Sequence, residues 1–182
     1  MRGWEHRSSR DALPLTSRSV QLRLATLDDA EAMRTIYNLE VETSTATFDL
    51  VTRSLEDQRS WLAERSGAHA AVVAVNDESV VGFASLSPYK ERAAYRTTVE
   101  DSVYVRRDHH GQGIGKILLS EMLSVARRHG FHAVMARIEA TREPSLALHR
   151  SCGFELVGVE REVGRKFGRW LDVALMQRLL DG

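Results

Sequence analysis

Three glycines stand at alternate positions, Gly111, Gly113 and Gly115, where a strand-like segment meets a helix-like one. The strand-like segment is TVEDSVYV, residues 98–105, and the helix-like one carries spaced apolar residues over 117–125. Glycine loses more conformational freedom on folding than other residues, so three in one turn call for a local reason. A glycine-rich turn at a helix N-terminus exposes unpaired backbone N–H groups at the positive end of the helix dipole. This turn therefore favours the binding of a phosphate or pyrophosphate.

Two known phosphate-binding motifs do not fit this turn. A P-loop requires glycine where His110 stands and serine or threonine where Ile117 stands. A dinucleotide-binding fingerprint requires a third glycine where Leu118 stands, and it follows the first strand of its domain rather than a later one. A tight turn without a ligand is the remaining alternative, which a single glycine would favour more than three alternating ones do.

Strand and helix patterns alternate along most of the chain. Short segments of alternating apolar residues are typical of half-buried strands, and apolar residues spaced by three or four mark helices. Ser54 with Asp57 resembles a capping box, the segment 76–79 signals a hairpin, and Pro144 suits the first turn of a helix. A chain of 182 residues is long enough for one α/β domain, expected over residues 20–182. We expect strands at residues 20–24, 70–75, 80–86, 98–105, 132–140, 154–161 and 169–180, and helices at 32–39, 55–62, 117–128 and from 144 onward.

The first nineteen residues differ from the rest. They carry four arginines and two acidic residues, and no apolar run follows, so they do not form a secretory signal. We expect a flexible basic tail over residues 1–19, and an organelle transit peptide is the weaker alternative because the segment lacks a clear amphipathic face.

Charge and cysteine content exclude several classes of protein. The chain has 25 basic and 25 acidic residues, and this zero net charge argues against partners such as nucleic acid or an anionic membrane. No apolar run reaches the roughly 20 residues that span a bilayer. The single cysteine, Cys152, excludes an intrachain disulfide and indicates a cytoplasmic protein with a buried thiol. His129 and His132 lack acidic or cysteine partners at ligand spacing, so we expect no metal.

Beyond these patterns, HHGQGIGKILL resembles the pyrophosphate-binding motif of the GCN5-related N-acetyltransferases (GNAT family). The segments 36–49, 89–105, 143–154 and 163–177 are similar to phosphinothricin, methionine sulfoximine and methionine sulfone acetyltransferases. The resemblance implies a single-domain GNAT fold whose mixed, mostly antiparallel sheet is flanked by helices and holds acetyl-CoA between splayed strands. It also implies a homodimer that transfers acetyl to the α-amine of a small amino-acid-like acceptor, without a metal.

The resemblance further implies which residues bind acetyl-CoA. Backbone groups at the end of the strand are expected to hold the pantetheine arm like an added short strand, and the glycine turn is expected to hold the pyrophosphate. Two positions depart from the family pattern. His110 replaces the Arg or Gln that begins the motif, and Arg142 replaces an Asn and could instead pair with a CoA phosphate. The expected set is Val103, Tyr104, Val105, Gly111, Gln112, Gly113, Ile114, Gly115, Lys116, Arg142 and Ser145.

Two residues match catalytic positions of the family. Glu100 is expected to be the general base that takes a proton from the acceptor ammonium, directly or through a water; without the resemblance, a solvent-facing strand glutamate would be the simpler interpretation. Asp101 is the poorer candidate because it should point to the opposite face of the strand. His149 stands where many relatives carry tyrosine, and it either protonates the leaving thiolate or packs near the cofactor without transferring protons.

The segment YKERAAYR resembles the acceptor-binding loop of these enzymes. A guanidinium there would bind the carboxylate of an amino acid bidentately and leave its α-amine near Glu100. Glu42, Thr43 and Phe48 are expected to wall the side-chain pocket, and residues 166–170 are expected to reach it, in a homodimer from the partner subunit. The expected substrate-binding set is Phe48, Lys90, Glu91, Arg92, Tyr95, Glu100, Asp101 and Ser102.

Two other functions stay open at this point. A protein or peptide N-terminal acetyltransferase would need an open acceptor groove rather than a carboxylate clamp. A non-catalytic acyl-CoA-binding sensor is permitted by the altered Arg142, whereas Glu100 at the catalytic position argues against it.

Overall fold

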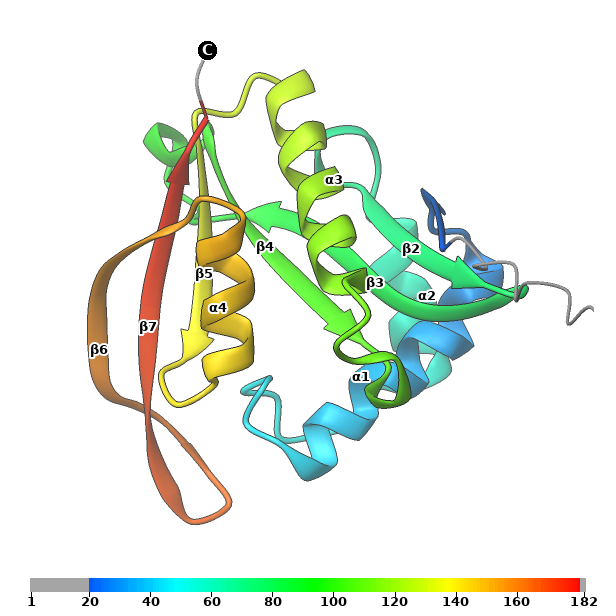
Figure 1. Cartoon of the computed structure of the whole chain (residues 1–182), viewed down its shortest axis with the longest axis horizontal. Coiled ribbons are helices and arrows are strands. Elements are labelled where there is room, and N and C mark those ends of the chain that lie inside the picture. Colours follow the sequence, from blue (N-terminus) through cyan, green and yellow to red (C-terminus); the bar gives the residue numbers. More distant parts are fainter. Residues whose placement is uncertain (1–19, 181–182) are drawn as a thin grey trace, which may run out of the picture.

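Seven strands form one sheet in the order β1-β2-β3-β4-β5-β7-β6, flanked by α-helices (Figure 1). The computed structural model describes residues 20–180, and the tail predicted at residues 1–19 lies outside this range. All neighbouring strands are antiparallel except β4 and β5, which confirms the predicted α/β class with a mixed, mostly antiparallel sheet. The strands are β1 (Gln21–Leu24), β2 (Ala71–Asn76), β3 (Ser79–Pro88), β4 (Thr98–Val105), β5 (Ala133–Glu139), β6 (Glu155–Lys166) and β7 (Arg169–Leu179). The α-helices are α1 (Ala30–Thr43), α2 (Leu55–Ala63), α3 (Ile114–Arg128) and α4 (Glu143–Ser151).

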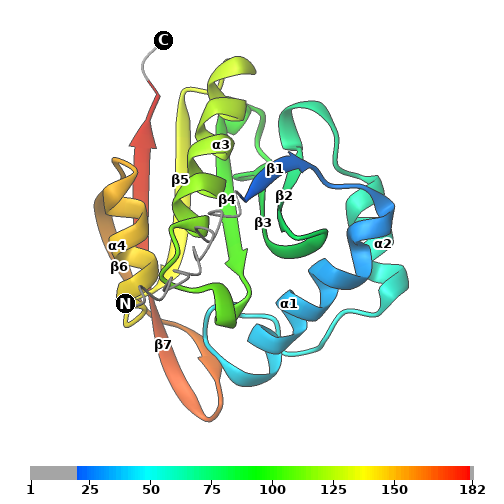
Figure 2. The ribbon, with the colours of Figure 1, turned by 45° about the vertical axis from the view of Figure 1, so that its right-hand side comes forward.

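Each face of the sheet has its own apolar core, because side chains alternate between the two faces along a strand. In β2, Ala71 and Val73 pack with residues of α1 and α2, whereas Val72 and Ala74 pack with residues of α3 and α4. Figure 2 shows α1 and α2 lying on the opposite side of the sheet from α3 and α4. The central strand β4 therefore presents successive side chains to two different sets of helices.

The parallel strands β4 and β5 pair only at their beginnings. Thr98–Glu100 pairs with Ala133–Met135, and beyond these residues the two strands diverge (Figure 1). From Asp101 to Val105, β4 pairs with β3 alone, so its other edge is open. This divergence is the predicted pair of splayed strands, and it opens a wedge in the middle of the sheet.

Local signals placed most element boundaries correctly. Ser54 Oγ accepts a hydrogen bond from the Asp57 N–H at 3.0 Å, and the Asp57 carboxylate accepts one from the Ser54 N–H at 3.0 Å, which confirms the capping box. The β2–β3 turn has positive φ at Asp77 (47°) and Glu78 (66°), the conformation of a tight hairpin. The prediction for β6 was wrong at its end, since the strand runs on to Lys166 after an irregularity between Glu160 and Gly164 that interrupts the alternating pattern.

Several side chains lie where the sequence predicted. Cys152 is buried and unpaired, and His129 and His132 are exposed. Within residues 20–180 no three His, Cys, Asp or Glu side chains are grouped so that they could hold a metal ion. Over the same range, no helix combines the length and the apolar character needed to cross a membrane.

Candidate active site

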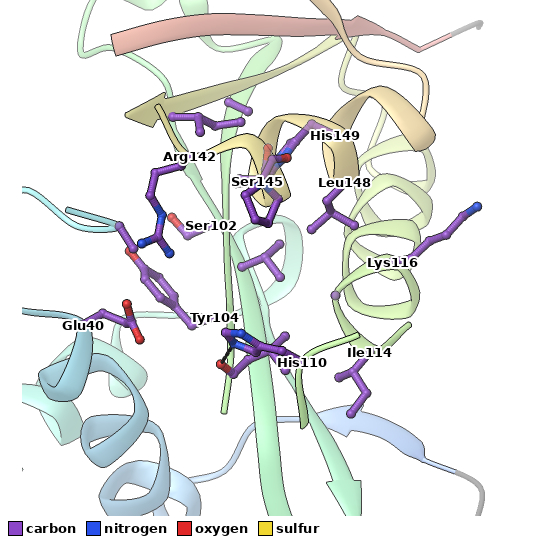
Figure 3. A pocket seen from close by; sticks show the side chains of 18 of the residues that line it. Glu40, Ser102, Tyr104, His110, Ile114, Lys116, Arg142, Ser145, Leu148 and His149 are labelled. Atoms are coloured by element: carbon purple, nitrogen blue, oxygen red, sulfur yellow. Dashed lines mark hydrogen bonds and ion pairs between the residues drawn. The ribbon is translucent and has the colours of Figure 1, made fainter. Parts of the chain in front are cut away.

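A cavity of about 350 Å³ lies in the wedge where β4 and β5 diverge. Its walls come from the ends of both strands, the N-terminal ends of α3 and α4, and the C-terminal end of α1 (Figure 3). Most of the predicted cofactor-binding and catalytic residues meet here although they are spread over fifty positions of the chain. The predicted residues that line it are Glu100, Asp101, Ser102, Val103, Tyr104, Val105, Gly111, Gly113, Ile114, Gly115, Lys116, Arg142, Ser145 and His149.

The three glycines of the turn are required for two different reasons. Gly111 and Gly113 have φ of 75° and 79°, in the left-handed region that other residues rarely adopt. Gly115, in the first turn of α3, lies against α4, where an added Cβ would stand 3.1 Å from Leu148 Cδ2. The turn and the close packing of the two helices thus depend on one short motif.

The turn leaves a row of backbone donors facing the cavity. None of the N–H groups from Gly111 to Lys116 donates a hydrogen bond to an acceptor within residues 20–180. Free amides at a helix N-terminus fit a pyrophosphate, which is the group predicted here. Gln112 is the exception among the predicted cofactor-binding residues, because its side chain turns back to the Asp108 carbonyl (3.4 Å) and does not line the cavity. His110 also turns back, and its Nε2 lies 2.8 Å from the Val105 carbonyl oxygen.

Glu100 lies where β4 and β5 begin to separate. Burial raises the pKa of its carboxyl group, and nearby Arg137 offsets only part of that effect. Arg137 itself pairs with Glu160, with an N–O distance of 2.9 Å. A half-buried carboxylate with a raised pKa at the base of a cavity is suited to accept a proton from an ammonium group.

Asp101 points to the opposite face of β4, as predicted, where it meets His149 of α4. His149 Nε2 lies 3.1 Å from Asp101 Oδ2, and Nδ1 lies 2.8 Å from the Ser145 carbonyl oxygen. Both ring nitrogens face oxygen atoms, an arrangement that favours the imidazolium form, in which both nitrogens carry hydrogens. Burial would lower the pKa of His149, but the hydrogen bond and charge of Asp101 raise it above its usual value. Asp101 Oδ1 is buried and has no partner within the described chain.

The cavity contains two buried acids that sequence reasoning missed. Glu40, 7% exposed, accepts a hydrogen bond from Arg107 Nε at 2.8 Å and another from Ser44. Burial would raise the pKa of Glu40, but Arg107, Ser44 and Arg142 together hold it below its usual value. Glu139, at the end of β5, accepts from Thr45 Oγ1 at 3.0 Å.

One sequence signal could have indicated Glu40. It follows Met33 and Tyr37 on the apolar face of α1, where an acid must be paired or functional. Glu139 is harder to find, because one of its partners, Thr45, lies 94 positions away in the chain, and the other, Thr141, forms only a local contact.

The structure does not bring the predicted acceptor loop into this cavity. Lys90, Glu91, Arg92 and Tyr95 line a separate open hollow after β3. Lys90 Nζ lies over the rings of Tyr89 (4.8 Å) and Tyr95 (5.1 Å), which holds this loop together. A role of the loop in acceptor binding therefore stays a prediction.

The segment between α1 and α2 is fastened to the β6–β7 hairpin. Lys166, 4% exposed, donates a hydrogen bond to the Thr47 carbonyl at 2.8 Å. The ring of Phe48 covers Gly164 so closely that a side chain there would clash with the ring in its present position. Phe48 is absent from the cavity lining, but its neighbour Ala46 is part of it.

Comparison with known proteins adds independent evidence. The model of the "Acetyltransferase (GNAT) family" matches residues 33–154. The chain is 37% identical, over 90% of its own length and 96% of the relative, to an L-methionine sulfoximine/L-methionine sulfone acetyltransferase of Pseudomonas aeruginosa.

Two solved structures resemble it closely. A phosphinothricin acetyltransferase from Sinorhizobium meliloti in complex with AcCoA has a TM-score of 0.85 and 38% identity, over 88% of each chain. A ribosomal-protein-alanine N-acetyltransferase from Brucella melitensis has a TM-score of 0.86 and 41% identity, over 88% of this chain and 99% of that one.

Proposed function

Because the chain belongs to the GNAT family of acetyltransferases, we propose that it moves the acetyl group of acetyl-CoA to the α-amine of a small amino-acid-like acceptor. The expected acceptors are of the phosphinothricin, methionine sulfoximine or methionine sulfone type, because its relatives are named for these compounds. One observation supports this most directly: the glycine turn, with its free amides, and Glu100 line a single cavity.

The residues of the cavity fit acetyl-CoA, which supplies an acetyl group activated as a thioester. The amides of the glycine turn and Lys116 hold the pyrophosphate at the N-terminus of α3. The open edge of β4, from Val103 to Val105, offers backbone groups to the pantetheine arm. Ser145 and Leu148 line the wall contributed by α4.

Glu100 acts on the acceptor. Its carboxylate takes one proton from the ammonium group, directly or through a water, and leaves an amine with a free electron pair. The amine nitrogen forms a bond to the acetyl carbon as the carbon–sulfur bond breaks, and the nitrogen then gives up its second proton to water, which leaves a neutral amide. The sulfur leaves as a thiolate that takes up a proton. His149 is the predicted donor of that proton. To donate it, one of its ring N–H groups would have to leave Asp101 or the Ser145 carbonyl and turn to the sulfur.

Release of CoA thiol tests the proposal. Purified protein would be given acetyl-CoA and, one at a time, phosphinothricin, methionine sulfoximine, methionine sulfone, ordinary amino acids, polyamines and short peptides. Saturable release with one of the first three supports the proposal. Release with peptides alone would favour a protein or peptide N-terminal acetyltransferase instead; the Brucella relative is named a ribosomal-protein-alanine N-acetyltransferase. Binding of acetyl-CoA with no release for any amine would favour a sensor.

Replacing Gly113 by alanine is expected to raise the KM for acetyl-CoA about fivefold or more. At φ 79° an L-residue costs about 1–2 kcal/mol, which shifts the turn away from the shape that aligns its amides. Steady-state kinetics at saturating acceptor measures this change. The matched control is Gly158→Ala on β6, where an added Cβ meets nothing within 4 Å. Equal KM values for the two variants would contradict a role of the glycine turn in binding acetyl-CoA.

We further propose a cytoplasmic homodimer, in line with the family resemblance and the free, buried Cys152. Apolar side chains on the edge hairpin support the dimer, since Val159, Val163 and Trp170 are each about half exposed. Light scattering after gel filtration is expected to give about twice the 20.5 kDa mass of one chain. Trp170→Lys is expected to shift the mass towards one chain. A wild-type mass of one chain would contradict the dimer.

A further inference from the structure

Arg142 is held at the mouth of the cavity by its backbone. It precedes α4, where its N–H donates to the Glu139 carbonyl at 2.9 Å. Its own carbonyl accepts from the N–H groups of Ser145 (3.0 Å) and Leu146 (3.1 Å). The side chain therefore starts from a fixed point between the end of β5 and the start of α4, and it lines the cavity (Figure 3).

The guanidinium of Arg142 makes no hydrogen bond or ion pair with any residue between 20 and 180. The other arginines near the cavity are engaged, Arg137 with Glu160 at 2.9 Å and Arg107 with Glu40 at 2.8 Å. A guanidinium has five N–H donors in a planar fork that matches a carboxylate. An unengaged fork directed into a cavity is thus available to an anionic ligand.

The hydrogen bonds of Glu40 do not involve Arg142. Glu40 faces it across the cavity (Figure 3), but both Glu40 oxygens already accept hydrogen bonds, from Arg107 Nε and Ser44 Oγ. The negative charge of Glu40 attracts the guanidinium of Arg142, but the N–H donors of that guanidinium stay free. Of the other three acids of the lining, Asp101 pairs with His149 and Glu139 accepts hydrogen bonds from Thr45 and Thr141, so Glu100 is left for a cationic group. Arg142 is therefore the anion-binding group at this end.

Position separates Arg142 from the phosphate end of the cavity. In Figure 3, Lys116 and Ile114 lie on one side and Arg142 lies on the other, beside Ser102. Ser102 is two residues after Glu100 on the same face of β4, which corresponds to about 7 Å along the strand. An acceptor whose amine meets Glu100 would therefore direct a neighbouring anionic group towards Ser102 and Arg142.

We propose that Arg142 binds the carboxylate of the acceptor and so selects free amino acids over neutral amines. This inference rests on the proposed function and names the specificity residue of the same site. It takes the place of a clamp by Arg92, which lines the separate hollow after β3. It also differs from an ion pair between Arg142 and a CoA phosphate.

The test compares methionine sulfone with its carboxamide, which keeps the amine and side chain but lacks the charge. Arg142→Gln is expected to lower kcat/KM for methionine sulfone by about 30-fold or more, and for the carboxamide by less than about threefold. The kcat/KM of Arg142→Lys for methionine sulfone is expected to lie between those of the wild type and Arg142→Gln. The KM for acetyl-CoA should change less than about twofold. Calorimetric titration of methionine sulfone into CoA-bound protein should show the same loss of affinity without turnover. Arg127→Gln, at an exposed position near the C-terminal end of α3 and outside the cavity lining, is the matched control, with both acceptors expected to stay within about twofold. Arg92→Gln tests the alternative clamp in the loop after β3.

Each outcome decides the inference. If Arg142→Gln raises the KM for acetyl-CoA and affects both acceptors equally, Arg142 serves the cofactor and the inference fails while the proposed reaction stands. If Arg92→Gln removes the preference, the clamp lies in the loop and the inference fails. If the wild type acetylates no free amino acid, the proposed reaction is wrong, and the calorimetric titration decides the inference separately. Binding of methionine sulfone by the wild type that is lost in Arg142→Gln supports the carboxylate clamp. Equal binding by the two proteins, or no binding by either, overturns it.

Discussion

Replacement of Glu100 by glutamine is expected to lower kcat about a hundredfold or more, with little change in the affinity for CoA. The amide keeps the size of the side chain but cannot take a proton from the acceptor ammonium. Glu100 lies at the fork of β4 and β5, away from the free amides of the glycine turn that are proposed to hold the pyrophosphate. Release of CoA thiol measures the loss of turnover, and titration of CoA measures the retained affinity.

The pH profile makes this test specific. Burial raises the pKa of Glu100, so the wild-type rate should begin to fall at a higher pH than an ordinary glutamate would give. As the pH drops through that raised pKa, the carboxylate takes up a proton and can no longer act as a base. The acid limb should be absent from the residual activity of Glu100→Gln. Glu56→Gln, an exposed position of α2, is the control. A glutamine variant with wild-type turnover would remove Glu100 from the mechanism.

Replacing Asp101 by alanine is expected to lower the free energy of unfolding by about 3 kcal/mol at pH 6. The change leaves the His149 imidazolium buried without its counter-charge, and the ring must then lose a proton or gain water. The folded-state pKa of His149 is raised, so this stabilisation is fully present below the unfolded value of about 6.5. It should fade as the pH rises through the folded-state pKa. Urea unfolding at several pH values measures both the size and the direction.

An exposed pair on the same helix provides the control. Arg150 and Glu143 of α4 lie 2.7 Å apart, and their side chains are 52% and 67% exposed. Glu143→Ala should cost no more than about 0.5 kcal/mol, because solvent screens such pairs. If Asp101→Ala were equally mild at every pH, the pair would not be the buried ionic contact described above.

The sequence was most informative where the cause of structure is local. The glycine turn needs left-handed φ at Gly111 and Gly113, and that requirement can be inferred from the alternating glycines themselves. The capping box at Ser54 and the two-residue hairpin turn are equally local. The opposite faces of Glu100 and Asp101 follow from the alternation of any strand.

What could not be predicted depends on contacts between distant segments. The pairing of Asp101 with His149 joins positions 48 residues apart, and neither residue type alone indicates it. Glu40 enters the cavity only because the C-terminal end of α1 meets Arg107, 67 positions later. The predicted acceptor loop resembles its family counterpart in sequence, yet its position relative to the cavity depends on where β3 ends, and that is a property of the whole sheet.

The contact between Phe48 and Gly164 has a consequence for how such proteins diverge. Two segments more than a hundred positions apart share one small volume beside the wall of the cavity, and Lys166 fastens them with a buried hydrogen bond to Thr47. A side chain at position 164 requires that the ring of Phe48 moves away or that residue 48 becomes smaller. Substitutions at the two positions should therefore covary among homologues. A new acceptor preference would then evolve through paired changes in the hairpin and the α1–α2 segment, while the glycine turn stays the same.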